Sequence, residues 1–241
     1  MSPTTELPAE FTGTRAELQR VATHVLAGAR AAHGGRFGLR VTPTGIATPP
    51  FGHDDTVVRV AGTDLVVESQ SDDGVTARAL SLHDVSLADA AAFTGSTLDG
   101  GFAPGADAPP IGDPDVRLVL DPTCVAIVLD WYRTGARVLD AVLPQLDRPS
   151  AAQLWPEHFD LGLQATTTAG GVNLGASPGD GGVSEPYLYV APWTDARPGD
   201  PDYWNASYGA VATRSTLLAG GDPVSAGIAF VTRGLELLAT A

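Results

Sequence analysis

Apolar and polar positions along the chain follow two periods, one typical of helices and one typical of strands. Between residues 14 and 33, apolar side chains recur at helical spacing and Gly34-Gly35 follows, which predicts a helix that ends there. Thr14 and Glu17 have the spacing of a capping box, so we expect this helix to begin at Thr14. Ser86 and Asp89 have the same spacing and predict a second, alanine-rich helix that stops near Gly95.

Short segments with period-two alternation lie between turn residues and predict strands. In the first half of the chain they cover residues 36–41, 45–51, 56–62, 64–69 and 76–82, and in the second half 116–121, 158–166, 171–177, 186–193 and, less clearly, 203–211. A long helix is predicted over 123–146, and a closing helix has Asp222 as N-cap and Pro223 at its first position. Because the short spacings require hairpins, we predict an α+β fold with mainly antiparallel sheets and flanking helices.

The chain reads as two halves joined by residues 99–115, which are rich in Gly, Pro and Asp and predict a loop or linker. We therefore expect an N-terminal α+β half over residues 1–98 and a C-terminal α+β half over 116–241. The halves share weak sequence similarity, since "FGLRV" and "VVRVA" in the first parallel "FDLGL" and "YLYVA" in the second. If this likeness is real, the halves are pseudo-symmetric, the strands near Phe37 and Phe159 are equivalent, and a shared cleft is the natural place for a ligand.

Composition and charge narrow the classes of function. Apolar residues make up 44% and charged residues 17%, as in a globular protein. The net charge of −14 argues against nucleic acid and anionic membranes as partners. All 14 basic residues are arginines, so a lysine Schiff base, a pyridoxal phosphate enzyme and a lysine-bearing P-loop are excluded. The single cysteine, Cys124, lies in an apolar run and excludes a disulfide framework or a cysteine-based zinc site.

The sequence shows neither a secretory signal nor a membrane span, and this bears on the expected compartment. The first residues, "MSPTTELPAEF", lack the basic region and apolar stretch of a signal peptide, and no apolar run reaches the length of a membrane span. We therefore expect an acidic, cytoplasmic protein with no membrane partner.

The segment "QLWPEHFDLGLQ", residues 153–164, places Glu157, His158 and Asp160 together in a chain with few histidines. On a strand over 158–166, alternation puts His158 and Asp160 on one face. Pairing of the next strands would bring four further polar side chains to the same face, which is more typical of a ligand site than of a core; they are Asn173, Glu185, Tyr187 and Tyr189. Three tryptophans of this region would either line the pocket or fill the core, and these are Trp155, Trp193 and Trp204.

The motifs of residues 153–210 also carry a resemblance. The segments "LWPEHFDLG", "NLGASPGD", "EPYLYVAPW" and "WNASYGA" resemble, in this order, motifs of an uncharacterised family of actinobacterial proteins. The resemblance implies that these segments belong to one site or one packing unit. It implies no activity and no cofactor.

Three functions remain open. The first is a small-molecule binding module with a polar pocket on the strands of residues 158–190. The second is a hydrolase- or isomerase-type enzyme with His158 as general base and Asp160 or Glu185 as its orienting carboxylate. In a metal-assisted version, Glu185 would join His158 and Asp160 as a ligand, because no second histidine follows. The third is a structural or interaction protein. The sequence favours the binding module, because it contains no complete catalytic constellation and no GxSxG elbow. It leaves the cofactor, the metal, the ligand and the oligomeric state open.

Overall fold

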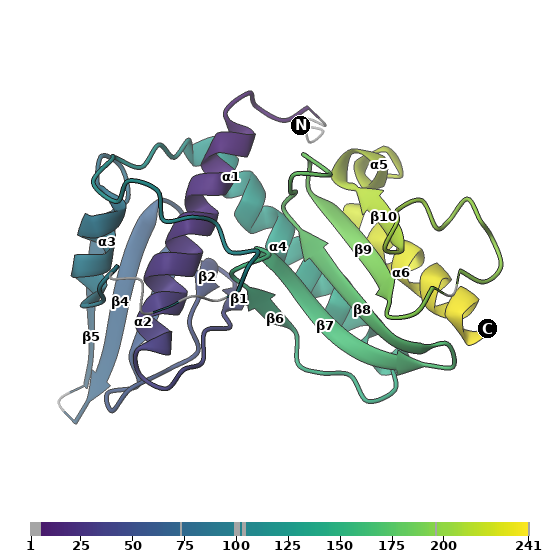
Figure 1. Cartoon of the computed structure of the whole chain (residues 1–241), viewed down its shortest axis with the longest axis horizontal. Helices are drawn as coiled ribbons and strands as arrows, with labels where there is room; N and C mark the ends of the chain where they lie inside the picture. Colours follow the sequence, from purple (N-terminus) through teal and green to yellow (C-terminus); the bar gives the residue numbers. More distant parts are fainter. Residues whose placement is uncertain (1–5, 73, 99–101, 103–104, 196, 241) are drawn as a thin grey trace. The chain divides into compact units, whose positions relative to one another are not determined.

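The structure is a computed structural model, and it describes residues 6–72, 74–98, 102, 105–195 and 197–240. The chain divides into two compact units (Figure 1). The N-terminal unit comprises Pro8–Leu129 and Leu154–Phe159, and the C-terminal unit comprises Asp130–Gln153 and Asp160–Ala241 with the described residues of Met1–Leu7. The chain therefore passes between the units within a helix and not at the predicted linker. Residues 99–101 and 103–104 of that linker lie outside the described residues.

Two five-stranded antiparallel sheets with helices make an α+β fold, which confirms the predicted fold class. Each sheet is a meander with its strands in sequence order. The first sheet consists of β1 (Arg40–Thr42), β2 (Gly45–Ala47), β3 (Val57–Ala61), β4 (Asp64–Ser71) and β5 (Gly74–Ser81). The second consists of β6 (Gln153–Trp155), β7 (Asp160–Thr167), β8 (Gly170–Ser177), β9 (Tyr187–Pro192) and β10 (Ala210–Thr213).

The pseudo-symmetry of the two halves stays a prediction. β1, which follows Phe37, is at the edge of its sheet, whereas β7, which follows Phe159, is second from the edge. These positions do not support the predicted equivalence of the two strands.

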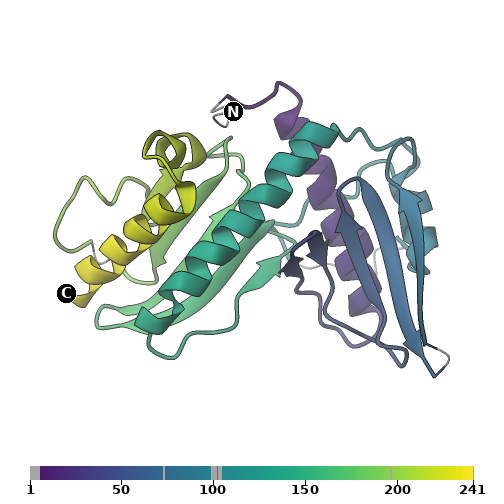
Figure 2. The same cartoon turned by 180° about the vertical axis from the view of Figure 1, so that it is seen from behind.

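The helices of the N-terminal unit lie on one side of its sheet, as both views show (Figures 1 and 2). The first helical stretch is continuous but changes type: α1 (Phe11–Arg20), a π-helix over Val21–Ala27, and α2 (Gly28–Ala31). The predicted start at Thr14 is wrong, because Thr14 is buried and its hydroxyl accepts a hydrogen bond from the Asp121 amide. The predicted capping box of Ser86 and Asp89 is confirmed at α3 (Leu87–Thr94).

In the C-terminal unit, the helices cover a single face of the second sheet (Figures 1 and 2). They are α4 (Pro122–Val142), of which the part from Asp130 belongs to this unit, α5 (Arg214–Ala219) and α6 (Pro223–Ala239); a short 3-10 turn, Leu143–Gln145, follows α4. Asp222 caps α6 as predicted, because its carboxylate accepts from the Ser225 amide at 2.8 Å. No helix in the described part of the chain is long and apolar enough to cross a membrane.

Two predicted strands differ from the structure, and one observed helix was not predicted. Residues 116–121 form a single bridge, Ser86 with Arg117, and no strand. Most of the predicted strand over 203–211 is irregular, with short turns and one isolated bridge between Ala206 and Gly209, and only its end enters β10. α5 has no counterpart among the predicted elements, since it is only six residues long.

Candidate functional site

The site begins with the strict alternation of β7, β8 and β9. One set of side chains faces α4 and α6 and is buried, and this set is Leu161, Leu163, Val172, Leu174, Ala176, Leu188 and Val190. The alternate residues point to the other face of the sheet, which we call the polar face: Asp160, Gly162, Gln164, Gly171, Asn173, Gly175, Ser177, Tyr187 and Tyr189, followed by Trp193. The sequence prediction that Asn173, Tyr187 and Tyr189 share a face with Asp160 agrees with this register.

Tyr189 lies across the sheet from β9 toward β7. A Cβ at its partner Gly175 would overlap the phenol ring, and one at Gly162 would lie 2.9 Å from the hydroxyl oxygen. The ring therefore occupies the space that two missing side chains leave. Its hydroxyl donates to Asp160 Oδ2 at 2.5 Å. Burial, followed by the negative charge of Asp160, raises the pKa of Tyr189 well above its ordinary value, so the phenol stays protonated and acts as a donor.

A second tyrosine–carboxylate pair lies beside the first. Tyr187 is 5% exposed, and its hydroxyl donates to Asp180 Oδ2 at 2.5 Å. The other oxygen of Asp180 accepts from the backbone amides of Gly182 and Val183, so this carboxylate also shapes the loop between β8 and β9. Burial and the Asp180 hydrogen bond raise the pKa of Tyr187. The two tyrosine rings are 6.3 Å apart between centroids.

Trp193 occupies the same face beyond the end of β9. Its amide donates to the Gly171 carbonyl at 2.9 Å, which extends the strand pairing by one residue. A Cβ at Gly171 would overlap the six-membered ring of the indole, so the ring lies over this glycine. The indole Nε1 donates to Asn173 Oδ1 at 2.8 Å. Trp193 is nevertheless 61% exposed, so a fixed aromatic surface faces the solvent.

Amide side chains lie between the two aromatic groups. Asn173 pairs across the strands with Gln164, and Gln164 is exposed. In the part of the chain that the structure describes, the Gln164 side-chain amide makes no hydrogen bond. Together with the second amide, that of Asn173, it offers neutral donors and acceptors to a ligand.

Glu185 has a different role from the predicted one. Its carboxylate accepts from the Ser215 amide at 3.0 Å and from the Ser215 hydroxyl at 2.9 Å. It thus holds the first turn of α5 and does not lie in the row of polar-face residues on β9, which begins at Tyr187.

The other two predicted tryptophans are not among the residues of the polar face. Trp204 packs against Tyr203 at 4.8 Å between ring centroids, and its Nε1 donates to the Pro198 carbonyl at 2.9 Å. Trp155 belongs to the N-terminal unit, where its ring meets Phe37 edge-on. Both contacts are those of packing side chains.

The predicted strand through His158 is wrong at its start. Residues 156–159 form a turn, and Phe159 has a φ of 54°, which breaks the strand alternation between His158 and Asp160. β7 begins only at Asp160. His158 is exposed, whereas Glu157 is buried beside α1, where its carbonyl accepts from the Gln19 side chain at 2.9 Å. The catalytic role given to His158 and Asp160 stays a prediction.

A metal centre gains no support. Across the described ranges, no group of three or more His, Cys, Asp or Glu side chains could hold a metal ion.

The sequence analysis missed Asp180, which bonds to Tyr187, and the glycines that make room for the Tyr189 ring. Asp180 lies in a loop, where alternation does not apply, and the glycines carry no side-chain signal. The pattern of glycines opposite aromatic residues at paired positions, Gly175 with Tyr189 and Gly171 with Trp193, could have revealed the stacked rings once the strand register was known.

Comparison with known proteins adds no identification. No family model, curated protein or solved structure matches the chain. The resemblance to an actinobacterial family therefore stays a prediction, and the function has to be argued from the polar face itself.

Proposed function

We propose that the C-terminal unit is a small-molecule binding module whose ligand is a short, neutral saccharide bound on the polar face. The observation that supports this most directly is the indole of Trp193, which is seated on Gly171 and bonded to Asn173 while its outer side stays exposed. A ring that is fixed before binding loses little conformational entropy when a ligand stacks on it. The C–H face of a sugar ring is an apolar surface that fits such a ring.

The amides beside Trp193 suit the hydroxyl groups of the same ligand. Gln164 and Asn173 each supply both donors and acceptors, and neither is charged. Trp193 is four positions beyond Tyr189, which corresponds to roughly 13 Å of extended chain at ~3.3 Å per residue. The polar face is therefore long enough for a ligand of more than one sugar ring.

Charge favours a neutral ligand over an anion. Asp160 and Asp180 lie at the tyrosine end of the polar face, and β7, β8 and β9 contain no arginine. An anionic ligand would meet these carboxylates, and none of the three strands supplies a cation to balance its charge. A cation would be attracted, and the experiment below includes that case.

The proposal is tested by titrating the whole chain with short gluco- and xylo-oligosaccharides and following binding by calorimetry. We expect the wild-type chain to bind and the affinity to fall by at least about tenfold in Trp193→Ala. Trp193→Phe keeps a flat ring and should retain part of the affinity. Trp204→Phe is the matched control, because this residue is a tryptophan of the same unit that lies away from the polar face. Its affinity should equal that of the wild type.

Two outcomes would contradict the proposal. Equal affinity in the wild type and Trp193→Ala would remove the polar face as the site. Binding of choline in preference to every saccharide, weakened by salt, would assign the face to cations by cation–π and carboxylate attraction instead.

The enzyme interpretation gains no support from the described contacts. Glu185, one of the two carboxylates expected to orient His158, is engaged by Ser215 at the start of α5. The binding module is therefore the function that the geometry favours.

A further inference from the structure

The first helical stretch of the N-terminal unit contains a feature that α-helical spacing does not predict. Val21–Ala27 is π-helical, and all seven of its residues are buried. π-helical turns are rare and are frequently found at functional sites. His24 is the titratable residue in this turn, and it is 7% exposed.

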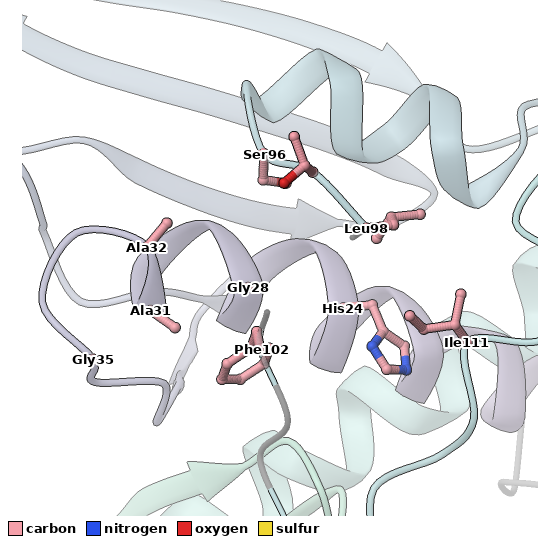
Figure 3. Close-up of a pocket in the computed structure, with 10 residues that line it drawn as sticks. His24, Gly28, Ala31, Ala32, Gly35, Ser96, Leu98, Phe102 and Ile111 are labelled. Atoms are coloured by element: carbon pink, nitrogen blue, oxygen red, sulfur yellow. The ribbon is translucent and has the colours of Figure 1, made fainter. Parts of the chain in front are cut away.

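A cavity of about 370 Å³ lies against this stretch, and His24 lines it (Figure 3). This volume falls within the range of small-molecule sites. The helical side of the cavity has almost no side chains, since Gly28, Ala31 and Ala32 form it. The opposite sides carry two hydroxyl residues, Ser96 and Thr97, and are otherwise apolar, with Leu98, Phe102 and Ile111 as the large side chains.

The segment carrying Ile111 is tied to the helix at two points. The Arg20 guanidinium donates to the Ile111 carbonyl from Nε at 3.0 Å and from Nη2 at 2.5 Å. His24 Nε2 lies 2.8 Å from the Pro109 carbonyl oxygen. These bonds hold one side of the cavity in place without a bound ligand.

The hydrogen bond to Pro109 determines the tautomer of His24. A carbonyl oxygen can only accept, so Nε2 carries the proton. Burial lowers the pKa of His24, and the nearby positive charge of Arg20 lowers it further, although the hydrogen bond to Pro109 acts in the opposite direction. The ring is therefore neutral at pH 7, and Nδ1 is an acceptor. Among the described residues, no side chain or backbone group donates to Nδ1. Figure 3 shows the imidazole on the same side of the helix as Phe102.

We propose that this cavity binds a small, neutral, mostly apolar molecule that carries one hydroxyl or N–H group and donates it to His24 Nδ1. Phenols and indoles represent this class. The cavity beside Gly28, Ala31 and Ala32 is large enough for a small ring, and the acceptor at His24 selects for a donor on it. Among the described residues that line the cavity, an anion would meet no cation. The neutral hydroxyl donors there are Thr97 and Ser96, and the Ser96 hydroxyl already donates to the Ala91 carbonyl at 3.3 Å.

The ligand class is tested with matched probes on the full-length chain. Phenol and 4-methylphenol should bind, and anisole, which has the added methyl group but no donor, should bind about tenfold more weakly. Indole and N-methylindole give the same comparison for an N–H donor. Equal affinities of phenol and anisole, or no binding of any donor probe at its solubility limit, would overturn the proposal.

The location is tested with two leucine substitutions on the same helical stretch. A Cβ at Gly28 would lie 3.8 Å from the Phe102 ring, an ordinary contact, so Gly28→Leu should fold and place its side chain in the cavity. We expect it to abolish phenol binding. Gly13→Leu is the control, because Gly13 is exposed and a Cβ there meets nothing within 4 Å. Equal loss in both variants, or none in Gly28→Leu, would place the probe elsewhere.

The role of His24 is tested by selectivity, which a merely structural role would not change. In His24→Phe, phenol and anisole should bind with equal affinity, because the acceptor is gone while a ring remains. A preserved preference for phenol would refute the role of Nδ1. Trp193→Ala should leave phenol binding unchanged, so this proposal and the saccharide proposal fail or stand separately.

Discussion

Two glycines in helix interiors should respond to the same substitution with opposite signs. Gly135 lies in α4 on the helix face that packs on the sheet, and a Cβ there would overlap the Cβ of Ala176 on β8. Gly28 lies in the first helical stretch at the edge of the cavity, and a Cβ there meets only the Phe102 ring, at 3.8 Å. Both residues are helical, so helix propensity alone predicts that alanine stabilises both by about 1 kcal/mol.

Packing reverses the sign at Gly135. The new methyl carbon would lie 2.3 Å from the Ala176 Cβ, whereas ordinary carbon–carbon contacts are ~3.5–4.0 Å, so it is ~1.2–1.7 Å too close. Ala176 has no rotatable side chain, and its strand pairs on both sides, with Leu161 on β7 and Leu188 on β9, so α4 has to move instead. Overpacking typically costs about 1–3 kcal/mol, and because no side chain at this contact can rotate away, we expect the upper part of that range, about 2–3 kcal/mol. After the propensity gain of about 1 kcal/mol, Gly135→Ala should lower the free energy of unfolding by about 1–2 kcal/mol.

The assay is urea unfolding of Gly135→Ala, Gly28→Ala and the wild type, with Gly13→Ala as the exposed reference for propensity. Thermal scans should show a lower Tm for Gly135→Ala by about 2–8 °C, since 1 kcal/mol shifts the Tm of a chain of this size by about 2–4 °C. Gly28→Ala should be as stable as the wild type or more so. If Gly135→Ala proves at least as stable as the wild type, the close packing of α4 on β8 is wrong.

Three further predictions test the site and its surroundings. Tyr189→Phe removes the donor to the Asp160 carboxylate and should lower the free energy of unfolding in urea by about 1.5–3 kcal/mol, since hydrogen bonds to charged groups contribute that much; no change would mean that water replaces the bond. Glu185→Gln weakens the charged acceptor that holds Ser215, so the amides of α5 should exchange hydrogen faster while those of α6 do not, and equal exchange would refute the capping role. The lowered pKa of His24 means that the unfolded chain takes up a proton near pH 6.5 that the folded chain binds only at lower pH. Stability from this residue is therefore complete above pH 6.5 and falls as the pH drops below it, and urea midpoints should show a shallower fall in His24→Phe than in the wild type.

The sequence predicted those parts of the fold that depend on local rules. Short alternating segments separated by turn residues indicated antiparallel meanders, because few residues are available for crossovers. Side chains that bond to nearby backbone determined two helix starts: the Ser86 box and the Asp222 cap are where the pattern placed them.

The errors arose where a distant contact overrides a local rule. Thr14 has the chemistry of a cap, but its hydroxyl accepts from the Asp121 amide, 107 residues away, and the helix continues past it to Phe11. Phe159 lies in an alternating run, yet it takes a left-handed conformation with its side chain buried. The spacing of apolar and polar residues within one segment carries no information about either feature.

The candidate site was predictable in its face but not in its bonds. Alternation correctly grouped Asp160, Asn173, Tyr187 and Tyr189, since strand register is fixed by the buried side. It could not show that Glu185 caps a helix absent from the prediction. Nor could it show the cavity beside His24, because a cavity depends on which side chains from three separate segments fail to fill a space.

The glycines of the polar face bear on whether this surface is built for binding or only for stability. Glycine weakens a strand interior, at a cost of about 0.5–1 kcal/mol relative to alanine, and three of them occupy β7 and β8 at Gly162, Gly171 and Gly175. On the helix-facing side of the same strands the chain uses large apolar residues. The glycines are tolerated because the rings of Tyr189 and Trp193 cover them, yet β-branched residues would pack a sheet surface more directly. The arrangement instead places two aromatic rings over these glycines, and the ring of Trp193 is left exposed to solvent. The exposed side of the Trp193 ring buries no surface in the fold, and a fixed, exposed ring is what stacking on a ligand requires.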